Sequence, residues 1–153
     1  MSNIALPEID QSILRKKATI ISDLKKITNS ENVLSEDDEV KAYETDSLLA
    51  YKQKPLVVVL PENTLEVSKI LKYCNENKIK VIPRGAGTGL SGGALPLQDG
   101  IVVSLGKFNK ILEIDFDNNC VVTQPGVTNL SITHSVQHKD LYYAPDPSSQ
   151  LIC

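Results

Sequence analysis

Alternating apolar and charged positions predict a helix near the start of the chain. Over residues 11–27 the apolar side chains recur at close to helical spacing, as Ile13, Leu14, Ile20, Ile21, Leu24 and Ile27. The acidic residues 36–39 then predict the first turn of a short helix, because negative charge there complements the helix dipole. Ser35 is the expected cap of that helix.

A strand–helix–strand unit is predicted next. The apolar run PLVVVLP at 55–61 is typical of a strand buried on both faces. Residues 63–77 predict a helix that begins at Asn63 or Thr64, and residues 79–82 predict a second strand. A crossover of this length implies parallel pairing, and we expect the two strands to be adjacent. The apolar stripe of the helix is Leu65, Val67, Ile70, Leu71 and Cys74.

The second half of the chain predicts more strands and one further helix. Residues 101–105 form an apolar run, and residues 111–126 predict a hairpin with Asn118 and Asn119 at its tip. The apolar face of its first strand would be Leu112, Ile114 and Phe116. A helix capped by Thr128 or Asn129 should follow, running to His138. The predicted fold class is therefore α+β, a mixed α/β domain.

Glycines concentrate in one loop between the predicted strands. Six of the eight glycines lie between Gly85 and Gly100. Glycine leaves backbone N–H groups uncovered and allows left-handed dihedral angles, so successive N–H groups can form a nest that binds phosphate. Arg84, Thr88 and Ser91 add a cation and two hydroxyls to this loop.

Two familiar phosphate-binding motifs do not fit this loop. A P-loop needs Gly-Lys followed by Ser or Thr, and no such step occurs. A Rossmann fingerprint would need a third glycine where Leu90 stands, and Pro96 prevents a helix from following. Two interpretations remain: a long irregular loop that wraps a diphosphate with its backbone, or a glycine-rich surface loop without a ligand.

Composition narrows the function classes. The net charge is −3 and Trp is absent, so a nucleic-acid partner is not expected. Three scattered cysteines predict reduced thiols in a reducing compartment. The N-terminus lacks the features of a signal peptide, and no apolar stretch approaches the ~20 residues of a membrane span. We expect a cytoplasmic protein, peripheral to the inner face of the membrane through partners at most.

Other polar clusters carry weaker signals. His134 and His138 share a helical face, but the Glu of a metalloprotease helix is missing, so no metal site is predicted. Ser148 and Ser149 have no His and Asp set to activate them, so no catalytic residue is assigned.

Residues 83–93, PRGAGTGLSGG, resemble the pyrophosphate loop of the vanillyl-alcohol oxidase or PCMH-type FAD-binding domain. The chain is similar to the family that comprises the FAD-linked subunit of bacterial glycolate oxidase and the D-lactate dehydrogenases. KPLVVVLPENTLEVSKIL, TQPGVTNL and YYAPDPSSQ agree with the same family, so the resemblance covers roughly residues 10–153.

The resemblance implies FAD as cofactor and oxidation of a small 2-hydroxy acid, glycolate or D-lactate, to the 2-oxo acid. It implies that the loop donates main-chain N–H groups to the FAD diphosphate and that the PDPSS run lines the flavin site. The cofactor-binding residues implied are Pro83, Arg84, Gly85, Ala86, Gly87, Thr88, Gly89, Leu90, Ser91, Gly92, Pro145, Asp146, Ser148 and Ser149.

The family pattern also implies that this chain is an incomplete FAD domain. Residues 1–48 are expected to form an N-terminal helical segment and residues 49–153 the FAD-binding domain, truncated before its C-terminal part. The substrate or cap domain is expected to be absent, so the chain alone would be inactive. The alternative is an inactive relic or a split-gene module that depends on the downstream polypeptide or on other oxidase subunits.

Overall fold

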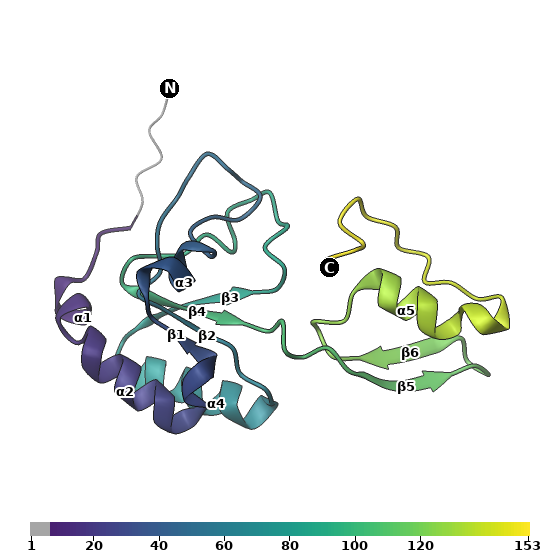
Figure 1. The fold of residues 1–153 in the computed structure, drawn as a ribbon, viewed down its shortest axis with the longest axis horizontal. Helices are drawn as coiled ribbons and strands as arrows, with labels where there is room; N and C mark the ends of the chain where they lie inside the picture. The colour runs from purple at the N-terminus through teal and green to yellow at the C-terminus, as the bar shows by residue number, and fades with distance from the viewer. Residues whose placement is uncertain (1–6) are drawn as a thin grey trace.

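A four-stranded mixed sheet organises the first lobe of the computed structural model, which describes residues 7–153 (Figure 1). The strands lie in the order β1-β2-β4-β3. β1 is antiparallel to β2, whereas β2, β4 and β3 are parallel. The strands are β1 (Val33–Leu34), β2 (Val57–Val59), β3 (Lys80–Arg84) and β4 (Gly100–Ser104). The predicted mixed α/β class is confirmed.

The expected adjacency of β2 and β3 is wrong, because β4 lies between them. Ile101 and Val102 of β4 are fully buried, and all five residues of this strand are buried. β3 instead carries Lys80, Pro83 and Arg84, of which Pro83 lacks an N–H group for a second neighbour. The more apolar strand therefore occupies the centre, and the strand with a proline takes the edge.

Two helices share one face of this sheet with α1 (Gln11–Arg15) at its margin (Figure 1). α2 (Lys17–Ile27) packs beside α4 (Thr64–Glu76). The helix predicted over residues 11–27 is interrupted at Lys16. One core cluster joins the helices to the strands, and it includes Ile13, Ile20, Leu24, Val57, Val59, Ile70, Cys74, Ile101 and Val103.

The caps and faces of these helices differ in part from the prediction. Asn63 is confirmed as the cap of α4, since its side chain accepts from the N–H of Glu66. Leu65 and Leu71, however, are 64% and 46% exposed, so the buried stripe is narrower than expected. The buried residues of α4 are Ile70 and Cys74, which belong to the core cluster shared with the strands.

The opposite face of the sheet carries α3 (Asp37–Lys41), whose Val40 packs against Val58, Ile82 and Val102. The cap of α3 is Glu36 instead of the expected Ser35. Glu36 and Glu39 form a capping box, in which each side chain accepts from the other residue's N–H. The Ser35 N–H also donates to the Glu39 carboxylate, so Ser35 precedes the cap and contributes its backbone to the same carboxylate.

A hairpin and a helix form the second lobe (Figure 1). β5 (Ile111–Asp115) pairs antiparallel with β6 (Cys120–Thr123), and Asn119 at the tip has φ +50°. An irregularity between Ile111 and Glu113 shifts the register, so Leu112 is 60% exposed instead of lying on a buried face. Thr128 caps α5 (Asn129–Val136), and the 3-10 turn η2 (Gln137–Lys139) follows.

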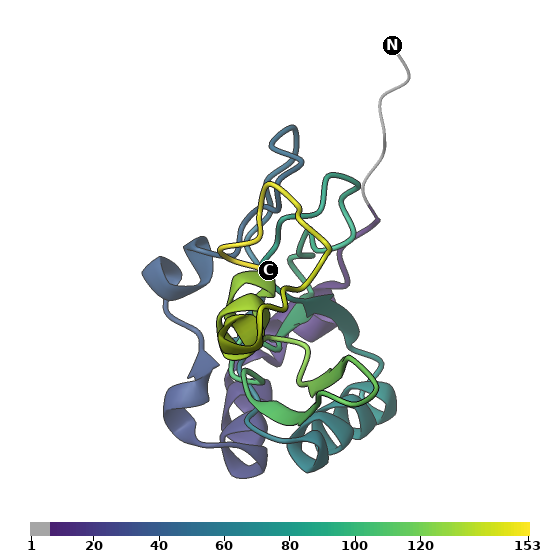
Figure 2. The same ribbon diagram turned by 90° about the vertical axis from the view of Figure 1, so that its right-hand side faces the viewer.

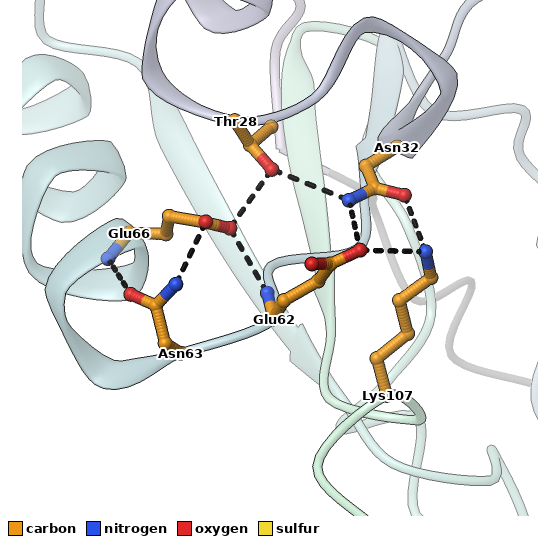
Figure 3. A network of polar contacts seen from close by, with 6 residues as sticks. All are labelled: Thr28, Asn32, Glu62, Asn63, Glu66 and Lys107. Carbon is orange, nitrogen blue, oxygen red and sulfur yellow. Dashed lines mark hydrogen bonds and ion pairs between the residues drawn. The ribbon is translucent and has the colours of Figure 1, made fainter.

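A polar network ties Thr28 and Asn32 to the linker between the lobes, residues 105–110 (Figure 3). Asn32, in the 3-10 turn η1 (Ser30–Asn32), is 1% exposed, and its amide donates to Glu62 and Thr28. Lys107, which follows β4, donates to both Asn32 and Glu62. Thr28 donates to Glu66, which in turn pairs with Asn63. The linker is thereby held at the end of the sheet.

The expected division of the chain at residue 48 remains a prediction. Residues on both sides of it share the first lobe, because β1 pairs with β2 and α2 packs against α4. The prediction that the N-terminus is no signal peptide concerns residues of which 1–6 lie outside the described part. Among residues 7–153, no helix is both long and apolar enough to cross a membrane.

Candidate functional site

The glycine loop lies at the carboxyl ends of the parallel strands. It leaves β3 at Arg84 and returns to β4 at Gly100. The segment between α3 and β2 lies beside it, and the C-terminal segment approaches from the second lobe (Figures 1 and 2). Ligands of open parallel sheets bind at this edge, so the loop occupies a favourable position for a cofactor.

Two loop glycines adopt the left-handed conformation that the sequence predicts for this loop. Gly87 has φ +77° and Gly92 has φ +75°. At Gly85 and Gly89 an added Cβ would meet no atom within 4 Å, so open space faces their backbone. The loop therefore combines two turns that need glycine with a backbone that is open to a ligand.

A cavity of about 460 Å³ separates the glycine loop from the second lobe. Its lining joins residues 85–89 to Gly106 in the linker and to residues 125–127 before α5. The remaining lining residues are Ala94, Ile152 and Cys153. No lining residue carries a charged side chain.

The N–H groups of residues 85–89 are available to a ligand. Within the described range 7–153, none of them donates a hydrogen bond to another residue. Thr88 adds a hydroxyl to the same lining. Backbone N–H donors around an uncharged cavity suit the oxygens of a diphosphate, and the cavity is open on the side of Gly85 and Gly89. The residues present fit the diphosphate of FAD.

Several predicted residues lie near this cavity but do not line it. Pro83 belongs to β3, and Leu90 is 72% exposed at the loop surface. Ser91 is exposed, and Gly92 packs against Leu48. Arg84 does not line the cavity, and its side chain donates to the carbonyls of Thr45 and Ala94. The structure thus brings together residues 85–89 of the predicted loop and places the others around them.

The predicted PDPSS residues do not reach the cavity either. Asp146 lines a separate cavity of about 400 Å³ together with Tyr142 and Tyr143. The Ser149 carbonyl accepts from the N–H of Cys153, and their side chains lie 2.8 Å apart. Ser149 therefore fixes the turn that carries Ile152 and Cys153 to the cavity. Pro145 and Ser148 are exposed, and the roles of all four stay predictions.

Gly106 and Gly126 are site residues that the sequence reasoning missed. Gly126 lies so close to the linker that a Cβ would be 2.7 Å from the Leu105 carbonyl oxygen and 2.8 Å from that of Phe108. Its N–H donates to the Phe108 carbonyl at 2.7 Å. The QPG step before α5 was the available signal, because glycine after proline is typical of a tight turn.

The two histidines lie on different elements. His134 belongs to α5, and His138 lies beyond its end in η2 with its ring against Phe116. In the described part of the chain, no group of three or more His, Cys, Asp and Glu side chains could hold a metal ion.

Residues 55–153 match the family model described as FAD binding domain. The chain therefore belongs to this family, which confirms FAD as the predicted cofactor. It is 42% identical over 149 residues to the glycolate oxidase subunit GlcD of Escherichia coli (strain K12), covering 97% of this chain and 29% of that protein. It is 40% identical over 119 residues to a D-lactate dehydrogenase of Anaerostipes hadrus, covering 77% of this chain and 25% of that protein.

Solved structures agree with the fold. A p-cresol methylhydroxylase with bound substrate matches with a TM-score of 0.71 and 27% identity, over 87% of this chain and 26% of that one. A 4-ethylphenol oxidase from Gulosibacter chungangensis matches with a TM-score of 0.74 and 25% identity, over 89% and 27%. The predicted PCMH-type fold and the predicted family are confirmed. The chain spans less than a third of the length of these relatives.

Proposed function

We propose that this chain is the FAD-binding part of a flavin-dependent oxidoreductase that oxidises a small 2-hydroxy acid, glycolate or D-lactate, to the 2-oxo acid. The cavity carries the proposal, because residues 85–89 present unused N–H groups to an uncharged lining. The names of the relatives support the substrate class, since they include a glycolate oxidase subunit and a D-lactate dehydrogenase.

In this proposal the chain binds and orients the cofactor. The N–H groups of residues 85–89 and the Thr88 hydroxyl hold the diphosphate. Gly106 and Gly126 place no side chain on the opposite wall. When bound, FAD supplies the two-electron acceptor that amino-acid side chains lack. The flavin ring is proposed to lie against the PDPSS run, namely Pro145, Asp146, Ser148 and Ser149.

The partners proposed follow from the same relatives. The substrate-binding part would correspond to the region of the relatives that this chain does not cover. Other oxidase subunits are proposed partners, because the Escherichia coli relative is named as a subunit. A cytoplasmic location, peripheral to the membrane through such subunits, is supported by three cysteines that are all free.

The first prediction concerns Gly87. Gly87→Val should weaken FAD binding by about tenfold or more, because a β-branched residue at φ +77° strains the loop by about 1–3 kcal/mol. Gly93→Val is the matched control, since a Cβ at Gly93 meets no atom within 4 Å and its φ is not positive. Flavin absorbance of the purified protein and titration of the apoprotein with FAD measure the effect.

A protein that also contains the substrate-binding part tests the substrate class, because this chain alone is expected to be inactive. In that protein, glycolate or D-lactate added without oxygen should bleach the bound flavin, and L-lactate is the stereochemical control for D-lactate. Full flavin occupancy in the Gly87→Val variant would contradict the role of the loop. A protein with both parts that binds FAD but is bleached by none of these acids would overturn the proposed substrate and favour the non-catalytic alternative.

A further inference from the structure

The Arg84 side chain is held by contacts with other parts of the protein and does not line the cavity. Its Nη1 donates to the Thr45 carbonyl at 2.8 Å and to the Ala94 carbonyl at 3.3 Å. The guanidinium also lies over the ring of Tyr43, 5.4 Å from its centroid. These partners come from the segment before β2 and from the end of the glycine loop. Arg84 therefore connects two segments that are distant in sequence.

The backbone of Gly87 crosses directly over this guanidinium. A Cβ at Gly87 would lie 2.3 Å from Arg84 Nη2 and 2.6 Å from Cζ. On the other side, the N–H of Ser47 and its hydroxyl donate to the Gly87 carbonyl at 3.0 and 3.3 Å. The left-handed turn at Gly87 is thus held between Arg84 and Ser47.

This arrangement leaves phosphate recognition to the other side of the loop. Arg84 does not line the cavity, whereas Gly87 and its neighbours do. The lining holds no charged side chain, and the free N–H groups of residues 85–89 and the Thr88 hydroxyl are donors in it. The geometry differs from the sequence expectation, in which the arginine supplied a cation to the phosphates.

We propose that Arg84 is a positioning residue, which clamps the glycine loop onto residues 43–47 and leaves the FAD diphosphate to the loop's N–H groups. The inference rests on the proposed role of the loop in FAD binding. It extends the cofactor site to residues 43–47, which precede the part of the chain that matches the family model. Ser47 and Tyr43 then support the cofactor site without touching the cofactor.

Substitutions at Arg84 separate a clamp from a phosphate ligand. Arg84→Met and Arg84→Lys should both weaken FAD and ADP binding, by about tenfold. Methionine has no donor, and lysine lacks the planar guanidinium that lies over the Tyr43 ring while it donates to both carbonyls. A lysine can still act as a point charge toward phosphate, so a direct ligand would be rescued by Arg84→Lys. Lys110→Met removes an exposed charge elsewhere and is the control.

Salt dependence provides the second arm. Calorimetric titration with ADP at rising NaCl concentration gives the slope of the logarithm of affinity against the logarithm of salt concentration. This slope should be the same for the wild type and for Arg84→Met, since no guanidinium–phosphate contact is lost. Ser47→Ala should weaken binding less, by about threefold, because the Ser47 N–H bond to Gly87 remains. A shallower slope in Arg84→Met, or rescue by Arg84→Lys, would overturn the proposal.

A double-mutant cycle tests the clamp without any cofactor. Gly87→Ala should lower the melting temperature more in the wild type than in Arg84→Ala, because only the wild type adds the collision with the guanidinium. Equal shifts in both backgrounds would contradict the clamp. If the wild type bound neither ADP nor FAD, the proposed function would fail, and this cycle would still decide the role of Arg84.

Discussion

At the scale of single residues, the shape of the candidate cofactor site depends chiefly on positions where a side chain has no room. The richness of the loop in glycine predicts its left-handed turns, and Gly87 and Gly92 adopt them. Gly126 could not be predicted in this way, because the demand for glycine there comes from the approach of the linker. Local chemistry also predicts Asn63 as a cap, whereas the choice of Glu36 over Ser35 depends on a reciprocal bond with Glu39.

Gly126 leads to a prediction at this scale. Gly126→Ala should lower the free energy of unfolding by about 1–3 kcal/mol, since its Cβ would press on the carbonyls of Leu105 and Phe108. FAD affinity should fall as well, because Gly126 and the adjacent linker residue Gly106 line the cavity. Urea unfolding and FAD titration measure both effects.

Gly93→Ala serves as the control for this substitution, since open space surrounds that position. An unfolding free energy of Gly126→Ala equal to that of the control would contradict the close approach of the two segments.

At the scale of elements, the periodicity of apolar residues predicts where helices and strands occur. It predicts less well which elements lie next to one another. The apolar runs at β2 and β4 and the stripe of α4 are visible in the sequence, but the strand order is not. That order depends on burial across the whole sheet, in which the two central strands, β2 and β4, are buried throughout and Pro83 suits an edge.

Asp99 joins elements in a way that is sensitive to pH. Its carboxylate, in the turn before β4, is 2% exposed and accepts from Lys80 Nζ and from the Asp10 N–H, each at 2.7 Å. Burial raises the pKa of Asp99. The hydrogen bonds and the Lys80 charge together lower it by more than burial raises it, so the pKa lies below the ordinary value of 3.8. A carboxylate whose pKa is lowered in the folded state stabilises the fold at pH values above its ordinary pKa. This stabilisation is lost as the pH falls through the lowered pKa of the folded state.

Asp99→Asn should therefore lower the free energy of unfolding at pH 7 by about 2 kcal/mol. The difference between the variant and the wild type should shrink as the pH falls below about 4. Asp117→Asn, at an exposed hairpin position, controls for the loss of one charge. Urea unfolding from pH 7 to pH 3 tests this, and a difference that stays constant across that range would contradict the linkage.

At the scale of the whole molecule, the candidate site lies where two lobes meet. The resemblance of the glycine loop to a known family indicates FAD and the family, and both are confirmed. The residues alone do not indicate that the linker after β4 and the turn before α5 would form the opposite wall. That arrangement depends on contacts between segments about 20 to 75 positions apart, such as Gly126 with Phe108 and Lys107 with Asn32. Such contacts leave no periodic pattern in the sequence.

The last prediction concerns the network that holds the linker (Figure 3). Lys107→Met should lower the free energy of unfolding by about 1–3 kcal/mol, because the amide oxygen of Asn32, a residue only 1% exposed, loses its donor. The next residue back, Gly106, lines the cavity, so a loosened linker should also weaken FAD binding. Lys110→Met removes a lysine from the same linker and is the matched control. Urea unfolding and FAD titration of both variants measure the two effects, and equal values for Lys107→Met and Lys110→Met would show that the network does not position the linker.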